Sequence, residues 1–344
     1  MIIGACGYGG TGSSAVKDLL KEYDGFMTLD RAEFQLAFKV DGLQDLEYHL
    51  VKQYSRHMSG DIAIKRFLES AMYAKTPIVK KIYVNNDKFL ECTKKFIESI
   101  TQTTWRGFDN FDFETKNPIY NFIVLVLKKT IIPFYERVTK KTYSIWPMRK
   151  MTLSIRPDFF YEAAKIYTNS ILKLSGADFD KNIVLDQPFE GNAPEQSFPF
   201  FDNPYAIVID RDPRDLYIAA SYQWPDGTFM PRRDPNAFVE YYKRQRMNLK
   251  ENRRVLRIKL EDMIFEYEKT VGEIEEFLGL DNSQHINPRK YFDPEISIKG
   301  VQLFEKIEGH KKEIEYIEKY LAEFLYPFSN YEKAKNNKEI EWIP

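Results

Sequence analysis

One glycine-rich segment, residues 7–14 (GYGGTGSS), constrains the fold more than any other part of the sequence. The apolar run IIGAC at 2–6 precedes it, and a helical pattern follows it with four apolar residues on one face: Val16, Leu19, Leu20 and Tyr23. A strand, a glycine-rich loop and a helix in this order direct backbone N–H groups and a helix N-terminus at an anion. The pattern predicts a phosphate-binding loop with six contact residues: Gly9, Gly10, Thr11, Gly12, Ser13 and Ser14. The alternative is a turn whose glycines serve tight packing.

The loop differs from the one that binds nucleoside triphosphates in ATPases and kinases. A Walker A loop reads GxxxxGK[ST], and here Ser13 stands where the lysine belongs. That lysine contacts the β- and γ-phosphates, so its loss removes the usual route to phosphoryl transfer. A nucleotide with fewer terminal phosphates fits this loop better.

Three more short apolar runs predict strands, at 183–185, 206–209 and 255–260. Short strands separated by helical segments are typical of an α/β fold with a parallel sheet flanked by helices. Ligands of such sheets lie beyond the carboxyl ends of the strands. Residues 42–178 have helical patterning and are rich in Phe, Tyr and Lys, so we expect a single domain, 1–344, with a large and mainly helical insertion on the acceptor side.

The C-terminal end of the chain predicts a helix followed by a loose tail. Five apolar residues follow helical spacing with Lys and Glu between them: Ile314, Ile317, Leu321, Phe324 and Leu325. Residues 329–344 are mostly polar, and we expect them to be loosely held.

Charge and hydropathy exclude several classes of partner. The chain has 50 basic and 51 acidic residues, so no overall field favours nucleic acid or a membrane. The most apolar run, 122–127, ends at Lys128 and is too short for a transmembrane helix of about 20 residues. The two cysteines form no disulfide framework, the N-terminus does not resemble a signal peptide, and the four histidines show no metal-ligand spacing. These features predict a cytoplasmic protein without a metal.

Two motifs resemble the sulfotransferases that use 3′-phosphoadenosine 5′-phosphosulfate (PAPS). Residues 11–14 (TGSS) resemble the end of that family's 5′-phosphosulfate loop, [KR]-[ST]-G-[ST]-[ST], with Gly10 at the basic position. Residues 207–217 (IVIDRDPRDLY) resemble the family's 3′-phosphate element. The resemblance implies that Arg211 binds the 3′-phosphate. The family's serine eight residues later is Ala219 here, so we carry its role to Ser221, two residues further on.

Two further stretches resemble the same family, and the whole resemblance covers residues 1–38 and 183–326. Residues 255–280 resemble a packing element in which Leu260 replaces the tyrosine that often meets adenine. Residues 291–304 (YFDPEISIKGVQLF) resemble the C-terminal loop that folds over the cofactor. Lys299 and Gly300 match its KG pair, and Lys299 either offsets the missing basic residue at the loop or is a solvated surface lysine.

Two carboxylates compete for the role of catalytic base, which takes a proton from the acceptor. Glu33, in RAEFQLAF, resembles the base of heparan sulfate sulfotransferases. Asp186, in Asp-Gln-Pro, lies near the position where cytosolic sulfotransferases have a catalytic histidine. Each is otherwise a surface or capping carboxylate, and the sequence leaves both open.

The predicted function is the transfer of a sulfuryl group from PAPS to a hydroxyl or amine of an acceptor, with no metal. Residues 128–156 contain eight basic residues and one acidic residue, interleaved with four aromatic ones: Phe134, Tyr135, Tyr143 and Trp146. This suits a carbohydrate acceptor that is acidic or lipid-linked, although a solvated helix face has the same composition. The alternatives are an atypical P-loop phosphotransferase and a non-catalytic nucleotide-binding protein.

Overall fold

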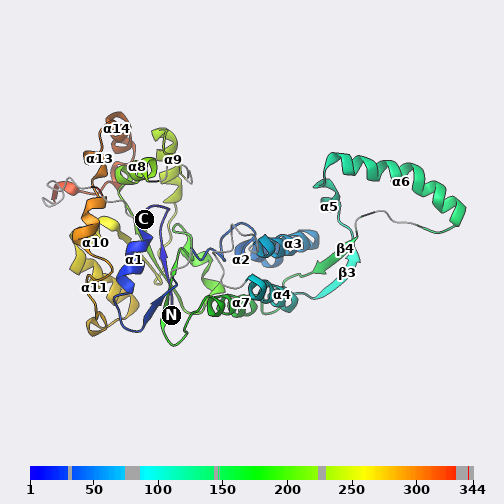
Figure 1. Cartoon of the computed structure of the whole chain (residues 1–344), viewed down its shortest axis with the longest axis horizontal. Helices are drawn as coiled ribbons and strands as arrows, with labels where there is room; N and C mark the ends of the chain where they lie inside the picture. The colour runs from blue at the N-terminus through cyan, green and yellow to red at the C-terminus, as the bar shows by residue number, and fades with distance from the viewer. Residues whose placement is uncertain are drawn as a thin grey trace.

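A five-stranded parallel sheet holds the glycine-rich loop at its centre (Figure 1). The computed structural model describes residues 1–29, 33–73, 86–142, 146, 148–223, 230–330 and 340. The strand order is β2-β5-β1-β6-β7, with bounds β1 Ile2–Cys6, β2 Phe26–Thr28, β5 Asn182–Asp186, β6 Pro204–Asp210 and β7 Val255–Lys259. Every neighbouring pair is parallel, so all carboxyl ends reach one edge. The predicted α/β fold is confirmed, and β2 is a strand that the sequence analysis did not identify.

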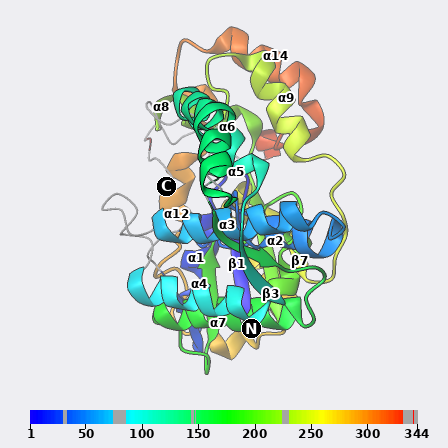
Figure 2. The same ribbon diagram turned by 90° about the vertical axis from the view of Figure 1, so that its right-hand side faces the viewer.

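Helices cover both faces of the sheet because its central strand is buried on both sides. All five residues of β1 are buried, and Ile3 and Ala5 pack on one face while Ile2 and Cys6 pack on the other. The first face is covered by α1 Ser13–Leu20, α10 Leu260–Phe265 and α11 Tyr267–Leu278. The second is covered by α2 Leu43–Glu47, α3 His57–Tyr73, α4 Asn86–Ser99 and α7 Phe160–Leu174 (Figure 2).

A third apolar cluster lies at the carboxyl-end side of the sheet. It unites α8 Pro213–Tyr222, α9 Pro235–Gln245 and α14 Lys311–Tyr320, with α13 Leu303–Lys306 in the preceding loop. The short helix α12 Pro294–Ser297 lies earlier in that loop and contacts α10. The predicted C-terminal helix ends at Tyr320, because the chain turns there and directs Phe324 onto Tyr242 at a ring distance of 5.3 Å. Of the expected loose tail, 331–339 and 341–344 lie outside the described residues.

The segment 42–178 also contains an antiparallel hairpin that the helical patterning did not predict. Strands β3 Thr103–Gly107 and β4 Arg149–Leu153 pair with Trp105 opposite Met151. Threonine and tryptophan favour strands, which explains the difference from the expected helix. Between these strands come α5 Asn110–Glu114 and α6 Pro118–Thr139. Residues 103–153 form an arm that projects from the rest of the protein, and α6 lies at its end, away from the five-stranded sheet (Figure 1).

Helix α6 extends well past the six apolar residues considered in the sequence. It continues through Lys128 to Thr139 and has 22 residues. By length and composition alone it is the described helix that could cross a membrane, with a mean hydropathy of 1.2. The sequence analysis ended this apolar run at Lys128, whereas the helix continues, because the two lysines interrupt the apolar run without ending the helix.

Candidate functional site

The glycine-rich loop connects β1 to α1 in a form that leaves donors facing outward. Gly9 and Gly10 have φ angles of 78° and 69°, a left-handed conformation that side chains disfavour. Successive backbone N–H groups in a turn can form a concavity that binds an anion. Within residues 1–29 and the other described parts, these two N–H groups donate to no protein acceptor. The first turn of α1 contains no acidic residue, so its N-terminus also favours an anion.

Thr11 fixes the shape of this loop through its hydroxyl. The side chain is 1% exposed. Its Oγ1 donates to the carbonyl of Ile209 at 2.9 Å and accepts the N–H of Tyr8 at 3.0 Å. The hydroxyl is therefore used inside the protein, where it ties the loop to the end of β6.

We expect the change Thr11→Val to destabilise the protein by about 2 kcal/mol, since two buried backbone groups lose their partner in a residue of the same shape. Thr11→Ser keeps the hydroxyl and should lose less than half of that amount. Urea denaturation followed by circular dichroism measures the free energy of unfolding. A larger loss in Thr11→Ser than in Thr11→Val would show that methyl packing, and not the hydroxyl, holds the loop.

Asp186 lies at the carboxyl end of β5 and contacts the start of α1. Its Oδ1 accepts from the Ser13 hydroxyl at 3.3 Å, and its Oδ2 forms an ion pair with Lys17 Nζ at 3.3 Å. Gln187 adds to this contact, because it accepts the Gly7 N–H at 3.1 Å and donates to Ser13 Oγ at 3.2 Å. Lys17 was missed in the sequence, although it stands four residues after Ser13 and thus on the same side of α1.

Glu33 lies beside Asp186, so the structure brings the two candidate bases together. The N–H of Phe34 donates to the backbone carbonyl of Asp186 at 2.7 Å. Desolvation and then the negative charge of Asp186 raise the pKa of Glu33, and the hydrogen bond from Gln35 opposes them. Lys17 and Ser13 hold Asp186, whereas the side chain of Glu33 accepts its hydrogen bond from Gln35.

Arg211 connects two of the predicted cofactor segments from a buried position. Its side chain is 1% exposed. Nη1 donates to the carbonyl of Gly10 at 3.3 Å and Nη2 to the carbonyl of Gly300 at 2.5 Å. Its Nε is buried and has no partner among the described residues. The guanidinium thus joins the glycine-rich loop to the C-terminal loop and retains one unused donor.

The residues that follow Arg211 hold the C-terminal loop in place. Asp215 accepts the N–H groups of Gln302 and Leu303 at 2.7 and 2.6 Å. Burial raises the pKa of Asp215 to about 7, although the charge of Arg211 lowers it. Asp212 caps α8 and pairs with Arg214, so both side chains have a structural role.

The other two predicted cofactor contacts, Ser221 and Lys299, lie in different segments of the chain. The Ser221 hydroxyl bonds to the carbonyls of Tyr217 at 2.9 Å and Arg232 at 3.1 Å, which ties the end of α8 to the next segment. Lys299 is half-buried in a short turn, and its carbonyl accepts from Lys306 Nζ at 3.1 Å.

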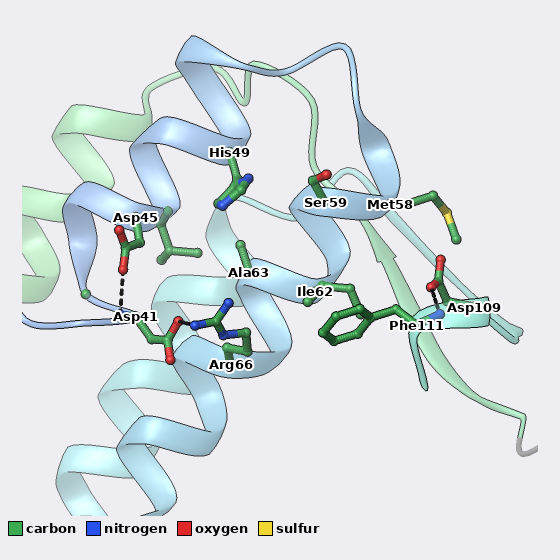
Figure 3. A pocket seen from close by; sticks show the side chains of 12 residues that line it. Asp41, Asp45, His49, Met58, Ser59, Ile62, Ala63, Arg66, Asp109 and Phe111 are labelled. Carbon is green, nitrogen blue, oxygen red and sulfur yellow. Dashed lines mark hydrogen bonds and ion pairs between the residues drawn. The ribbon is translucent and has the colours of Figure 1, made fainter. Parts of the chain in front are cut away.

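A separate cavity of about 360 Å³ lies on the insertion, between α2, α3 and the start of α5 (Figure 3). Asp41 in its wall pairs with Arg66 at 2.8 Å, and Asp45 and Asp109 add further carboxylates. No predicted site residue lines this cavity, and its carboxylates do not suit an acidic acceptor. In the described part of the chain, no group of three or more His, Cys, Asp or Glu is placed to hold a metal ion.

Comparison with known proteins gives structural matches of low similarity. No protein-family model and no curated protein matches the chain. The sulfotransferase domain of the Synechococcus PCC 7002 olefin synthase is 14% identical, with 93% of each chain covered and a TM-score of 0.37. A Mycobacterium avium sulfotransferase is 12% identical over 94% of this chain and 76% of its own, with a TM-score of 0.35. A mouse sulfotransferase complexed with PAP is 15% identical over 42% of this chain and 54% of its own, with a TM-score of 0.24.

Proposed function

We propose that the protein is a PAPS-dependent sulfotransferase that acts on a hydroxyl, or an amine, of a carbohydrate. The observation that carries this proposal is the cluster of Glu33, Asp186, Lys17 and Ser13 beside the glycine-rich loop. A carboxylate of raised pKa beside a lysine and a phosphate loop provides both a base and charge neutralisation for group transfer.

The residues present suit a nucleotide that carries phosphates at both ends of its ribose. The loop N–H groups and the α1 N-terminus would hold the 5′ end, which carries the sulfuryl group that PAPS supplies. Arg211, with its unused Nε, would hold the 3′-phosphate. Lys299, Gly300 and Ser221 remain proposed contacts from the segments around it.

Three side chains near the glycine-rich loop would have different roles in the reaction. Glu33 would take the proton of the acceptor hydroxyl, because its raised pKa makes its carboxylate a stronger base than an ordinary glutamate. Asp186 would position Lys17 and Ser13, which it contacts directly. Lys17 would supply the positive charge that the family motif places at position 10.

We further propose a saccharide acceptor, acidic or lipid-linked, and a cytoplasmic location. Four basic residues with exposed side chains support the first: Lys128, Lys129, Arg137 and Lys140. Tyr143, expected on the same surface, lies outside the described residues. The free thiols Cys6 and Cys92 support a reducing compartment.

Calorimetric titration with 3′,5′-adenosine diphosphate (3′,5′-ADP), 5′-AMP and ATP–Mg²⁺ tests the proposed donor. We expect micromolar binding of the bisphosphate, because both phosphates meet preformed donors. Binding of ATP–Mg²⁺ alone would favour the phosphotransferase. The presence of Ser13 at the position of the Walker A lysine is evidence against that alternative. Bisphosphate binding without turnover on any saccharide would favour the non-catalytic protein.

A further inference from the structure

Helix α6 exposes an apolar surface that nothing in the described chain covers. Of its 22 residues, Val124 is the buried one. The exposed fraction is 70% for Ile119, 68% for Phe122 and Phe134, and 66% for Val138. Soluble proteins rarely leave so many large apolar side chains together in water, and such patches mark sites of association.

Four exposed apolar residues share one side of α6, with Arg137 at the edge of that side, whereas Leu125 and Ile132 lie nearer to Lys128. At 100° per residue, Ile119, Ile123, Phe134 and Val138 follow one another along a single side. Lys128 lies on the opposite side, where its Nζ is 4.0 Å from the centre of the Trp146 ring. The helix therefore rests on its own arm with one side and presents the apolar side outward.

The position of the charges decides how this helix would meet a lipid bilayer. Lys128 and Lys129 stand at the middle of α6. If the helix crossed the membrane, both ammonium groups would lie near the bilayer centre, at a cost of roughly 2.5–3.5 kcal/mol each. A helix that lies in the plane of the interface with Ile123 and Phe134 toward the acyl chains keeps both lysines at the level of the head groups.

The same charges indicate which lipids are favoured. Residues 128–141 contain five basic residues and one acidic residue, Glu136. Each basic residue held near an anionic membrane surface contributes about 1 kcal/mol to the free energy of binding. The exposed aromatic ring of Phe134 suits the apolar side of an in-plane helix, where Trp, Phe and Leu are common.

We propose that α6 is a membrane-surface anchor, which lies in the plane of an anionic phospholipid bilayer with its Ile123 and Phe134 side buried among the acyl chains. This anchor depends on the exposed side chains and charges of the arm and is independent of the reaction at the glycine-rich loop. It would hold the full chain at a lipid surface as a peripheral protein.

Co-sedimentation of the full chain with phospholipid vesicles tests the anchor. We expect binding to vesicles of phosphatidylcholine mixed with phosphatidylglycerol, at least tenfold weaker binding to phosphatidylcholine alone, and further weakening by salt. The double variant Ile123→Asn/Phe134→Asn should bind the mixed vesicles at least tenfold more weakly. Ile166→Asn on α7, whose side chain is 67% exposed, is the matched control and should bind like the original chain.

Three results would overturn the proposal. The first is vesicle binding that the double variant retains while circular dichroism shows it folded. The second is resistance of the bound chain to alkaline carbonate, which releases interfacial helices and leaves spanning ones. The third is absence of vesicle binding together with a dimer, seen by sedimentation velocity, that the double variant abolishes; the apolar side would then be covered by a second copy of the chain.

Discussion

Changing Arg211 to methionine is expected to weaken the binding of 3′,5′-ADP about 30-fold while changing that of 5′-AMP by less than about threefold. The loss corresponds to about 2 kcal/mol, the range for a hydrogen bond to a charged group. Only the bisphosphate carries the 3′-phosphate that Arg211 is proposed to bind, so the ratio of the two dissociation constants isolates that contact. Calorimetric titration of both nucleotides measures it.

Because Arg211 also forms hydrogen bonds to two loops, an equal loss of affinity for both nucleotides is a second informative outcome. The guanidinium of Arg211 donates to the carbonyls of Gly10 and Gly300, so the variant also releases two loops. If both nucleotides lose affinity equally, Arg211 shapes the site without binding the 3′-phosphate. Arg214→Lys serves as the control, because Arg214 pairs with Asp212 and Glu318 and its loss should lower stability with no selectivity between the nucleotides.

The sequence predicts those parts of the site that depend on local pattern. The glycine-rich loop could be located because a strand, glycines and a helix follow one another within 20 residues. The ends of the parallel strands could be expected at one edge, which places Asp186 and Arg211 on the same side of the sheet. The role of Arg211 as a link between Gly10 and Gly300 could not be predicted, since no local rule pairs residues 89 positions apart.

Other features depended on contacts between distant segments. Glu33 and Asp186 meet because β2 pairs with β5, and β2 has three residues of weak pattern. Lys17 has its role through an ion pair with Asp186, 169 residues away. The hairpin of β3 and β4 flanks a 22-residue helix, so its strands pair across a separation that hairpin signals do not cover.

Exchanging Glu33 for glutamine is expected to lower kcat by roughly 100- to 10,000-fold, the contribution of a positioned general base. The affinity for 3′,5′-ADP should stay unchanged, since Glu33 is not proposed to bind the nucleotide. Gln35→Ala is the matched control, because it removes the hydrogen-bond donor of Glu33 and keeps the carboxylate. A steady-state assay with PAPS and the acceptor found by screening measures kcat, and calorimetry measures the affinity.

The pH dependence of the variant Asp186→Asn distinguishes Glu33 from Asp186 as the catalytic base. The charge of Asp186 raises the pKa of Glu33, so its removal lowers that pKa. Glu33 then stays deprotonated to lower pH, and the acidic limb of the kcat/KM profile should move to lower pH while turnover persists. If instead Asp186→Asn abolishes turnover and Glu33→Gln retains it, the base is Asp186, and Lys17 and Ser13 position the base itself. A shift of the acidic limb would therefore identify Glu33 as the carboxylate that takes the acceptor's proton. The size of the loss in kcat alone does not distinguish the two carboxylates.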